Sequence, residues 1–222
     1  ELCAISHCSL TPITIKEIPA TITDKLSVHL DASAECPCYV GRIIRGINPN
    51  ATTPIWLQER LRRSNIRRIH PVVDVMNYVM LELGQPLHAF DLSTISQRIY
   101  VRKSKPNEKV VLLDGQTLTL EKPALVIADD KEILALAGIM GGASSAVTTT
   151  TTDIFIESAF FFFFAIRPTL RELHLQSDAS HRFERGVDPT LASRAIQRAT
   201  ELVLSISGGQ AGPCIETIDS KH

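Results

Sequence analysis

The amino-acid sequence predicts an α+β fold, and three observations support this prediction. Segments that resemble short strands outnumber those that resemble helices, and the two kinds do not alternate one for one as in a doubly wound sheet. Between residues 98 and 142, apolar runs follow one another closely, and Asp114-Gly115 supplies a hairpin-turn signal. Two longer segments, residues 74–83 and 188–207, carry apolar residues at helical spacing and are followed by glycine.

The first part of the chain is expected to form strands, loops and one helix. Residues 1–35 contain short alternating apolar runs broken by Thr, Pro and Asp, and residues 41–47 read as a strand. Thr53 is expected to cap a helix with Pro54 in its first position, where the missing amide hydrogen would be unpaired anyway. This helix would face solvent with its arginines and the core with four apolar side chains: Ile55, Trp56, Leu57 and Leu61.

A second helix is predicted over residues 74–83, where apolar residues recur at three- and four-residue steps: Val75, Tyr78, Val79 and Leu83. Gly84 is expected to end this helix, because glycine readily adopts the left-handed conformation found at helix ends. The constrained Gly-Gln-Pro turn that follows presents His88 close to an aromatic residue and a carboxylate.

From residue 98 onward the pattern changes to strands, arranged as a meander or a sandwich. The expected strand runs are residues 99–104, 110–120, 124–130 and 133–142. An apolar strand, Ile154-Phe155-Ile156, then ends on Glu157, and two helices are expected to follow. The last helix would have Asp188 as its cap, Pro189 in its first position and Gly208-Gly209 as its stop.

The composition is that of a globular protein. The chain has 222 residues, of which 44% are hydrophobic and 21% charged, and its net charge is −1. No stretch approaches the ~20 apolar residues of a membrane span, and the N-terminus lacks the layout of a secretory signal. The chain begins with Glu1 rather than Met, so we expect it to be a piece of a longer protein.

Five cysteines occur without a secretory context, so reduced thiols are expected. Cys3 and Cys8, with His7 between them, and the pair Cys36 and Cys38 are the groupings that a metal could use. Their spacing does not favour a zinc site, and no metal is expected in this chain.

A local basic cluster stands out against the near-zero net charge. It spans eleven residues and contains five arginines and a histidine against the single Glu59: Arg60, Arg62, Arg63, Arg67, Arg68 and His70. Such a cluster is usually a solvated helix face, and it can also cradle a nucleic-acid backbone.

His88 and Glu157 are the residues with the clearest chemical potential. The imidazole of His88 can act as a base, a proton donor or an anion-binding donor, although a lone histidine more often holds a turn together. Strand alternation places Glu157 on the same face as Phe155, next to buried aromatic residues. Its carboxyl group either pairs with Arg167 or Arg182, or forms a polar contact at the base of an aromatic-sized pocket.

Three further segments can be interpreted either as purely structural or as part of a functional site. The glycines between Gly138 and Ala146 match no phosphate-binding spacing and favour a tight turn that forms a wall. The stretch from Ser177 to Ser180 either caps a helix or lines a pocket with small side chains. The phenylalanines at 160–164 must be mostly buried or covered by a partner. No Gly-x-Ser-x-Gly motif occurs, which argues against covalent catalysis.

Long motifs in a fixed order resemble the editing domain in the beta subunit of bacterial phenylalanyl-tRNA synthetase. They run from ECPCYVGRIIRGI through LRRSNIRRIHPVVDVMNYVMLELGQPLHAFD, LLDGQ, LALAGIMGG and IFIESAFF to SDASHRFERGVDP and GGQAGP, and they cover residues 35–215. We therefore expect one domain over residues 1–222, a fragment of a longer beta subunit, with residues 1–35 as lead-in strands and loops. The expected fold has β-sandwich-like sheets of unusual topology with helices packed outside, in three layers.

The resemblance implies post-transfer editing, the hydrolysis of tyrosine wrongly esterified to phenylalanine tRNA. A hydrophobic pocket rejects a substrate with one added hydroxyl by only ~10²-fold, so a second site that binds the hydroxyl is needed. By resemblance, His88 and Glu157 are the catalytic residues: Glu157 accepts the hydrogen bond of the tyrosine phenol, and His88 orients the ester or its water. Arg67 and Asn77 would contact the terminal adenosine or the ester. The pocket walls would be Gly141, Ser177 and Ala179.

The resemblance also implies partners. They are the 3′ end of phenylalanine tRNA and the alpha subunit of a heterotetrameric cytoplasmic enzyme, without membrane or DNA. No cofactor is expected in this fragment, whereas ATP and magnesium serve the synthetic reaction of the whole enzyme. The alternative is a non-catalytic tRNA-binding and subunit-scaffold module with decayed editing. Substitutions at positions where the family usually has other residues motivate it: Met76, His174 and Phe162–Phe164.

Overall fold

The computed structural model describes residues 2–219 and contains three sheets and six α-helices within that range. In chain order, the elements of the first half are α1 (Leu2–Ser6), β1 (Ser27–Leu30), β2 (Cys38–Arg45), α2 (Ile55–Arg63), α3 (Pro71–Leu83), β3 (Leu87–Asp91), η1 (Leu92–Thr94), β4 (Arg98–Lys103) and β5 (Glu108–Val111). The second half contains β6 (Thr117–Leu120), β7 (Leu125–Ala128), β8 (Ile133–Leu136), β9 (Met140–Gly141), η2 (Ala143–Ser145), β10 (Asp153–Phe160), α4 (Phe163–Leu173), α5 (Asp178–Phe183), α6 (Leu191–Ser207), β11 (Gln210–Ala211) and β12 (Ile215–Ile218).

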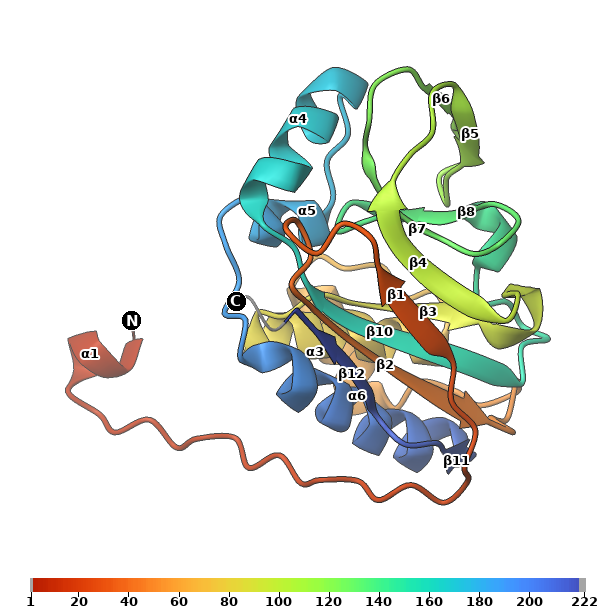
Figure 1. The fold of residues 1–222 in the computed structure, drawn as a ribbon. Helices are drawn as coiled ribbons and strands as arrows, with labels where there is room; N and C mark the ends of the chain where they lie inside the picture. The colour runs from red at the N-terminus through yellow and green to blue at the C-terminus, as the bar shows by residue number, and fades with distance from the viewer. Residues whose placement is uncertain (1, 220–222) are drawn as a thin grey trace.

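Two five-stranded sheets and a helical layer make up most of the molecule (Figure 1). The central sheet has the order β11-β2-β10-β3, with β12 beside β2, and all of its pairs are antiparallel. The second sheet has the order β1-β4-β7-β8-β9, in which β1 and β4 run parallel while the other pairs are antiparallel. A separate hairpin, β5–β6, carries the predicted Asp114-Gly115 turn.

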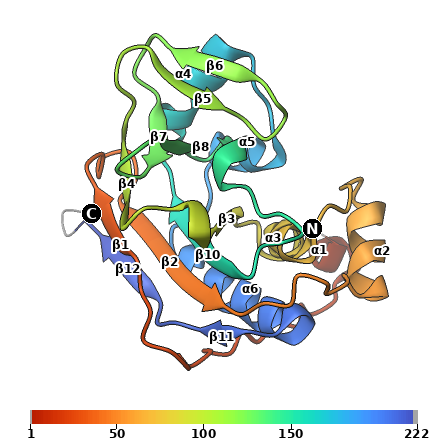
Figure 2. The same ribbon diagram turned by 90° about the vertical axis from the view of Figure 1, so that its right-hand side faces the viewer.

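The central sheet is covered on both faces, which gives the predicted three layers. Helices α3 and α6 pack on one face, which carries alternate residues of β2 and β10 such as Ile44 and Ile154, and α2 packs against α3. The second sheet packs on the other face together with α4 and α5, against side chains such as Phe90 and Phe155. Figure 2 shows the helical layer and the second sheet on opposite sides of β2 and β10. The α+β class and the sandwich-like arrangement are therefore confirmed.

Several predicted boundaries are wrong for identifiable reasons. Helix α3 begins at Pro71 rather than Asp74, because Nδ1 of His70 accepts a hydrogen bond from the amide of Val72 and caps it. Thr53 does not cap α2, since its hydroxyl donates to the carboxylate of Asp74 instead. Gly84 does end α3 in the left-handed conformation, as predicted.

Other differences concern the ends of the chain and the exposed side chains. Leu2–Ser6 is helical, whereas only strands and loops were expected there. Up to residue 219, three helices rather than two follow β10, and the last begins at Leu191 rather than beside Asp188. In α2 only Leu57 and Leu61 are buried, while the expected inward residues Ile55 and Trp56 are exposed.

The phenylalanine tract is only partly buried. Phe161 lies in the core, but Phe163 and Phe164 are 45% and 51% exposed. Among the described residues, no helix combines the length and the apolar character that crossing a membrane would require.

Candidate functional site

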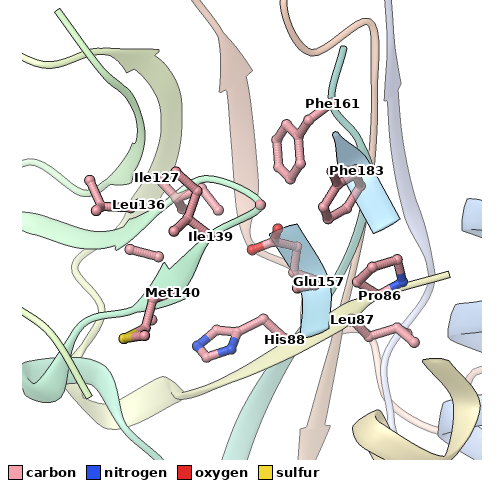
Figure 3. A pocket seen from close by; sticks show the side chains of 14 residues that line it. Pro86, Leu87, His88, Ile127, Leu136, Ile139, Met140, Glu157, Phe161 and Phe183 are labelled. Carbon is pink, nitrogen blue, oxygen red and sulfur yellow. The ribbon is translucent and has the colours of Figure 1, made fainter. Parts of the chain in front are cut away.

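A small cavity lies between the central sheet and the second sheet, next to α5 (Figure 3). Its volume is about 70 Å³. Strands β3 and β10 supply one wall, the segment from β7 to β9 the opposite wall, and α5 the end. The lining residues are Pro86, Leu87, His88, Ile127, Ala135, Leu136, Gly138, Ile139, Met140, Gly141, Glu157, Phe161, Ala179 and Phe183. Two of these side chains titrate, His88 and Glu157.

The strand register brings these two residues together. Glu157 on β10 is paired directly with His88 on β3, so their side chains leave the same face of the central sheet. In Figure 3 both point into the space bounded on the far side by Ile139 and Met140. The face predicted for Glu157 from alternation with Phe155 is thus correct.

Glu157 is a buried carboxyl group with little hydrogen bonding. It is 5% exposed, and its Oε2 accepts one hydrogen bond, from the hydroxyl of Tyr39 at 3.3 Å. Burial raises the pKa of Glu157 to about 8, against a smaller lowering by this hydrogen bond. The group is therefore mainly a neutral acid at pH 7.

The salt-bridge explanation for Glu157 is wrong, because both candidate arginines are engaged elsewhere. Arg167 donates to the carbonyl of Glu184, and Arg182 pairs with Asp178. Within residues 2–219, Glu157 forms no ion pair.

His88 is packed against glycine and is uncharged. A Cβ atom added at Gly141 would lie 2.5 Å from Cε1 of His88, so the imidazole occupies the space that a side chain would take. Its ring also makes an edge contact with Phe90, with 4.5 Å between the ring centroids. Burial lowers the pKa of His88 to about 4, and its Nε2 has no hydrogen-bond partner among the described residues.

Helix α5 is fixed to the cavity wall by its N-terminal cap. The hydroxyl of Ser177 accepts from the amide of Ser180 and donates to the carbonyl of Ile139 at 2.7 Å. The capping explanation for this stretch is therefore correct, and Ser177 stands beside the lining residues rather than among them. Ala179, the second residue of the helix, does line the cavity.

Arg67 and Asn77 do not line the cavity. Arg67 lies exposed in the loop between α2 and α3, and Asn77 is half-buried on α3. In the basic cluster, Arg62 pairs with Glu59, and Arg60 lies over the rings of Trp56 and Tyr78. Arg67 and its neighbour Arg68 make no ion pair or hydrogen bond with another described residue.

Sequence reasoning missed Tyr39 and most of the apolar lining. Tyr39 is fully buried and lies two residues before Gly41, which is paired with Glu157 across the sheet. Because the pairing joins residues far apart in the chain, no local pattern indicated it. Within the described range, no group of three or more His, Cys, Asp or Glu side chains is arranged to hold a metal ion.

Comparison with known proteins places the chain in a family. Residues 35–208 match the family of the B3/4 domain. The whole chain is 56% identical over 221 residues to a phenylalanine–tRNA ligase beta subunit of Legionella pneumophila (strain Lens), and it spans 28% of that protein. A beta subunit of Coxiella burnetii is 51% identical over 222 residues, again with 28% of its length covered.

A solved structure is similar in fold. It is the crystal structure of an N-terminal fragment of the phenylalanyl-tRNA synthetase beta subunit from Pyrococcus horikoshii, with a TM-score of 0.59 and 16% sequence identity. The likeness covers 93% of this chain and 58% of that fragment. The resemblance seen in the sequence motifs is confirmed, and this chain belongs to the B3/4 domain family.

Proposed function

We propose that this chain is an editing hydrolase that removes tyrosine wrongly esterified to phenylalanine tRNA. The observation that carries the proposal is the carboxyl group of Glu157, which is buried in the wall of a cavity lined mostly by apolar residues and has one hydrogen bond to the protein. A buried polar group without enough partners costs about 1–3 kcal/mol. The phenol of tyrosine would supply the missing partner, whereas the ring of phenylalanine would not.

The protonation state of Glu157 refines how the phenol would be bound. A neutral acid both donates and accepts, and so does a phenol, so a hydrogen bond forms on either side of the pKa of about 8. Discrimination against a ligand that lacks the hydroxyl can reach ~10⁴-fold when a site is built to bind it. Glu157 is thus suited to select tyrosine over phenylalanine.

His88 is suited to hold water or the ester in place. In the proposed reaction, a water oxygen adds to the ester carbonyl carbon, and the bond from that carbon to the ribose oxygen breaks. Products are tyrosine and the free 3′ end of the tRNA. With a pKa of about 4, His88 is a weak base at neutral pH. The Nε2 atom of His88 has no partner among the described residues, which supports a role in orienting the water or the ester. A ribose hydroxyl of the substrate would assist the transfer of the proton from the attacking water.

The other site residues have supporting roles in this proposal. Gly141 gives His88 its space, Ala179 forms a wall, and Ser177 holds α5 against the wall. Arg67 and Asn77, outside the cavity, would contact the terminal adenosine or the backbone of the tRNA.

We further propose that the chain acts within a phenylalanine–tRNA ligase, the name carried by its relatives. Its partners would be the 3′ end of phenylalanine tRNA and an alpha subunit in a cytoplasmic heterotetramer. ATP and magnesium would serve the synthetic reaction elsewhere in that enzyme. Residues 1–222 would form one editing domain of the longer beta subunit, with residues 1–35 leading into it.

One observation favours the second candidate, a non-catalytic tRNA-binding and scaffold module. The cavity of about 70 Å³ is smaller than the ~150 Å³ cavity known to hold benzene. Met140, partly exposed and flexible, would have to withdraw before an aromatic ring enters. A scaffold module would keep the cavity closed.

Release of amino acid from Tyr-tRNA and Phe-tRNA, both made on phenylalanine tRNA, tests the proposal. We expect this chain to release tyrosine and to leave phenylalanine attached. Binding of both tRNAs without release of either amino acid would favour the scaffold module.

A further inference from the structure

Tyr39 is a buried residue whose hydroxyl contacts Glu157. Its side chain is fully buried on the face of β2 that meets the second sheet. Its hydroxyl donates to Oε2 of Glu157 at 3.3 Å. No other described residue makes a hydrogen bond to either carboxyl oxygen of Glu157.

The sheet register explains why this contact comes from Tyr39. The residue directly opposite Glu157 on β2 is Gly41, which has no side chain to offer. The space above Gly41 is filled by Phe155, because an added Cβ would lie 2.3 Å from the ring carbon Cζ. Tyr39 stands two residues away on the same face, at the diagonal position that a long aromatic side chain can reach.

We propose that Tyr39 is the positioning residue of this site, holding one carboxyl oxygen of Glu157 so that the other faces the cavity and binds a ligand hydroxyl. The inference rests on the proposed function for its ligand, a phenol. In Figure 3 the carboxyl group of Glu157 extends toward Ile139, across the cavity.

The contact also fixes where the proton of the neutral acid resides. Because the Tyr39 hydroxyl donates to Oε2, that oxygen acts as an acceptor and the acidic hydrogen belongs on the oxygen that faces the cavity. A bound phenol then accepts this hydrogen through its oxygen. Once Glu157 ionises, the same oxygen accepts from the phenol instead.

Few other titratable side chains lie close enough to Glu157 to influence this proton. The titratable side chains near Glu157 are Tyr39 and Cys36 on the β2 side and His88 on β3. The cavity walls formed by β7 to β9 and by α5 contribute no titratable lining residue within the described range. The Tyr39 hydrogen bond lowers the pKa of Glu157, while burial raises it.

The experiment is a Tyr39→Phe substitution, which removes only the hydroxyl. We expect the pKa of Glu157, followed by ¹³C NMR of labelled glutamate and assigned with Glu157→Gln, to rise above its wild-type value. We also expect kcat/KM for release of tyrosine from Tyr-tRNA to fall by about tenfold, with release from Phe-tRNA unchanged.

Tyr78→Phe is the matched control. Tyr78 is also buried, and its hydroxyl donates to another carboxylate, Glu82, at 2.6 Å on the helical side of the molecule. This substitution should leave both the titration of Glu157 and the preference for tyrosine unchanged. If Tyr39→Phe leaves the titration of Glu157 where it is, the positioning role is overturned.

A second variant covers the case in which Tyr39→Phe does not fold. In Glu157→Gln the amide oxygen can accept from Tyr39 and the amide nitrogen can face the cavity as a donor. Preference for tyrosine that is retained in this variant supports the positioning role, while loss to the level of Glu157→Ala contradicts it. The titration needs no substrate, so a chain that hydrolyses nothing would refute the proposed function and still report on Tyr39.

Discussion

Two buried carboxyl groups in this chain have opposite surroundings. Asp74, in the first turn of α3, is fully buried and accepts from the hydroxyl of Thr53 at 2.5 Å and the amide of Ile69 at 2.9 Å. Glu157 is almost as deeply buried, yet it accepts a single bond at 3.3 Å and faces a cavity. Burial alone therefore does not identify a site, because it is the shortage of partners that leaves a carboxyl group free to bind a ligand.

The regions around Asp74 and Glu157 also differ in how fully their polar groups are hydrogen-bonded. Around Asp74 the helical layer and the α2–α3 loop are tied together by the carboxylate, so its role is to hold structure. Glu157 lines a cavity between the two sheets, and the neighbouring His88 also lacks a partner for Nε2 among the described residues. The comparison predicts that changes at the two positions have separable consequences for stability and for selectivity.

The largest effect on stability is expected from Asp74→Ala. The substitution leaves the buried hydroxyl of Thr53 and the amide of Ile69 without an acceptor, which should lower the free energy of unfolding by about 2–4 kcal/mol. Denaturant unfolding at pH 7 measures this loss. Selectivity for tyrosine should be preserved in the folded fraction, and a loss of selectivity without a loss of stability would remove the distinction between the two carboxyl groups.

A smaller effect on stability is expected from pH, and it isolates Glu157. Its pKa is raised to about 8 in the folded chain, so the folded state holds more protons than the unfolded state, and stability falls as pH rises toward 8. His88, whose pKa is lowered to about 4, acts in the opposite direction but only below pH ~6.5. Between pH 6.5 and 8 we therefore expect the wild-type chain to lose about 1.5 kcal/mol relative to Glu157→Gln.

Unfolding curves of both chains at several pH values provide this measurement. Other titrating groups contribute equally to the two chains and cancel in the difference. Parallel profiles across the window would mean that Glu157 ionises at an ordinary pH, and the neutral-acid account would then be wrong.

Features that depend on neighbouring residues in the chain could be predicted from the sequence. Alternation placed Glu157 and Phe155 on one face, and the glycine signals located the end of α3 and the β5–β6 turn. The polar residues from Ser177 to Ser180 indicated the helix cap that the structure contains.

Features that depend on residues far apart in the chain could not be predicted in this way. The hydrogen bond from Tyr39 to Glu157 joins residues 118 positions apart, and it follows from the register between β2 and β10. Threonine is locally favoured as a helix cap, but the hydroxyl of Thr53 donates to Asp74 instead of capping α2. This tertiary contact likewise cannot be seen in the local sequence. The cavity itself results from the packing of two sheets and α5, which periodicity does not describe.

The role that we propose for Glu157 is recognition of the hydroxyl group of a tyrosyl ester. The most direct test compares the ratio of kcat/KM for Tyr-tRNA and Phe-tRNA, both on phenylalanine tRNA, between the wild-type chain and Glu157→Ala. We predict a ratio well above one for the wild type that falls toward one in the variant, chiefly through slower release of tyrosine. An equal ratio in the two chains would contradict this role of Glu157.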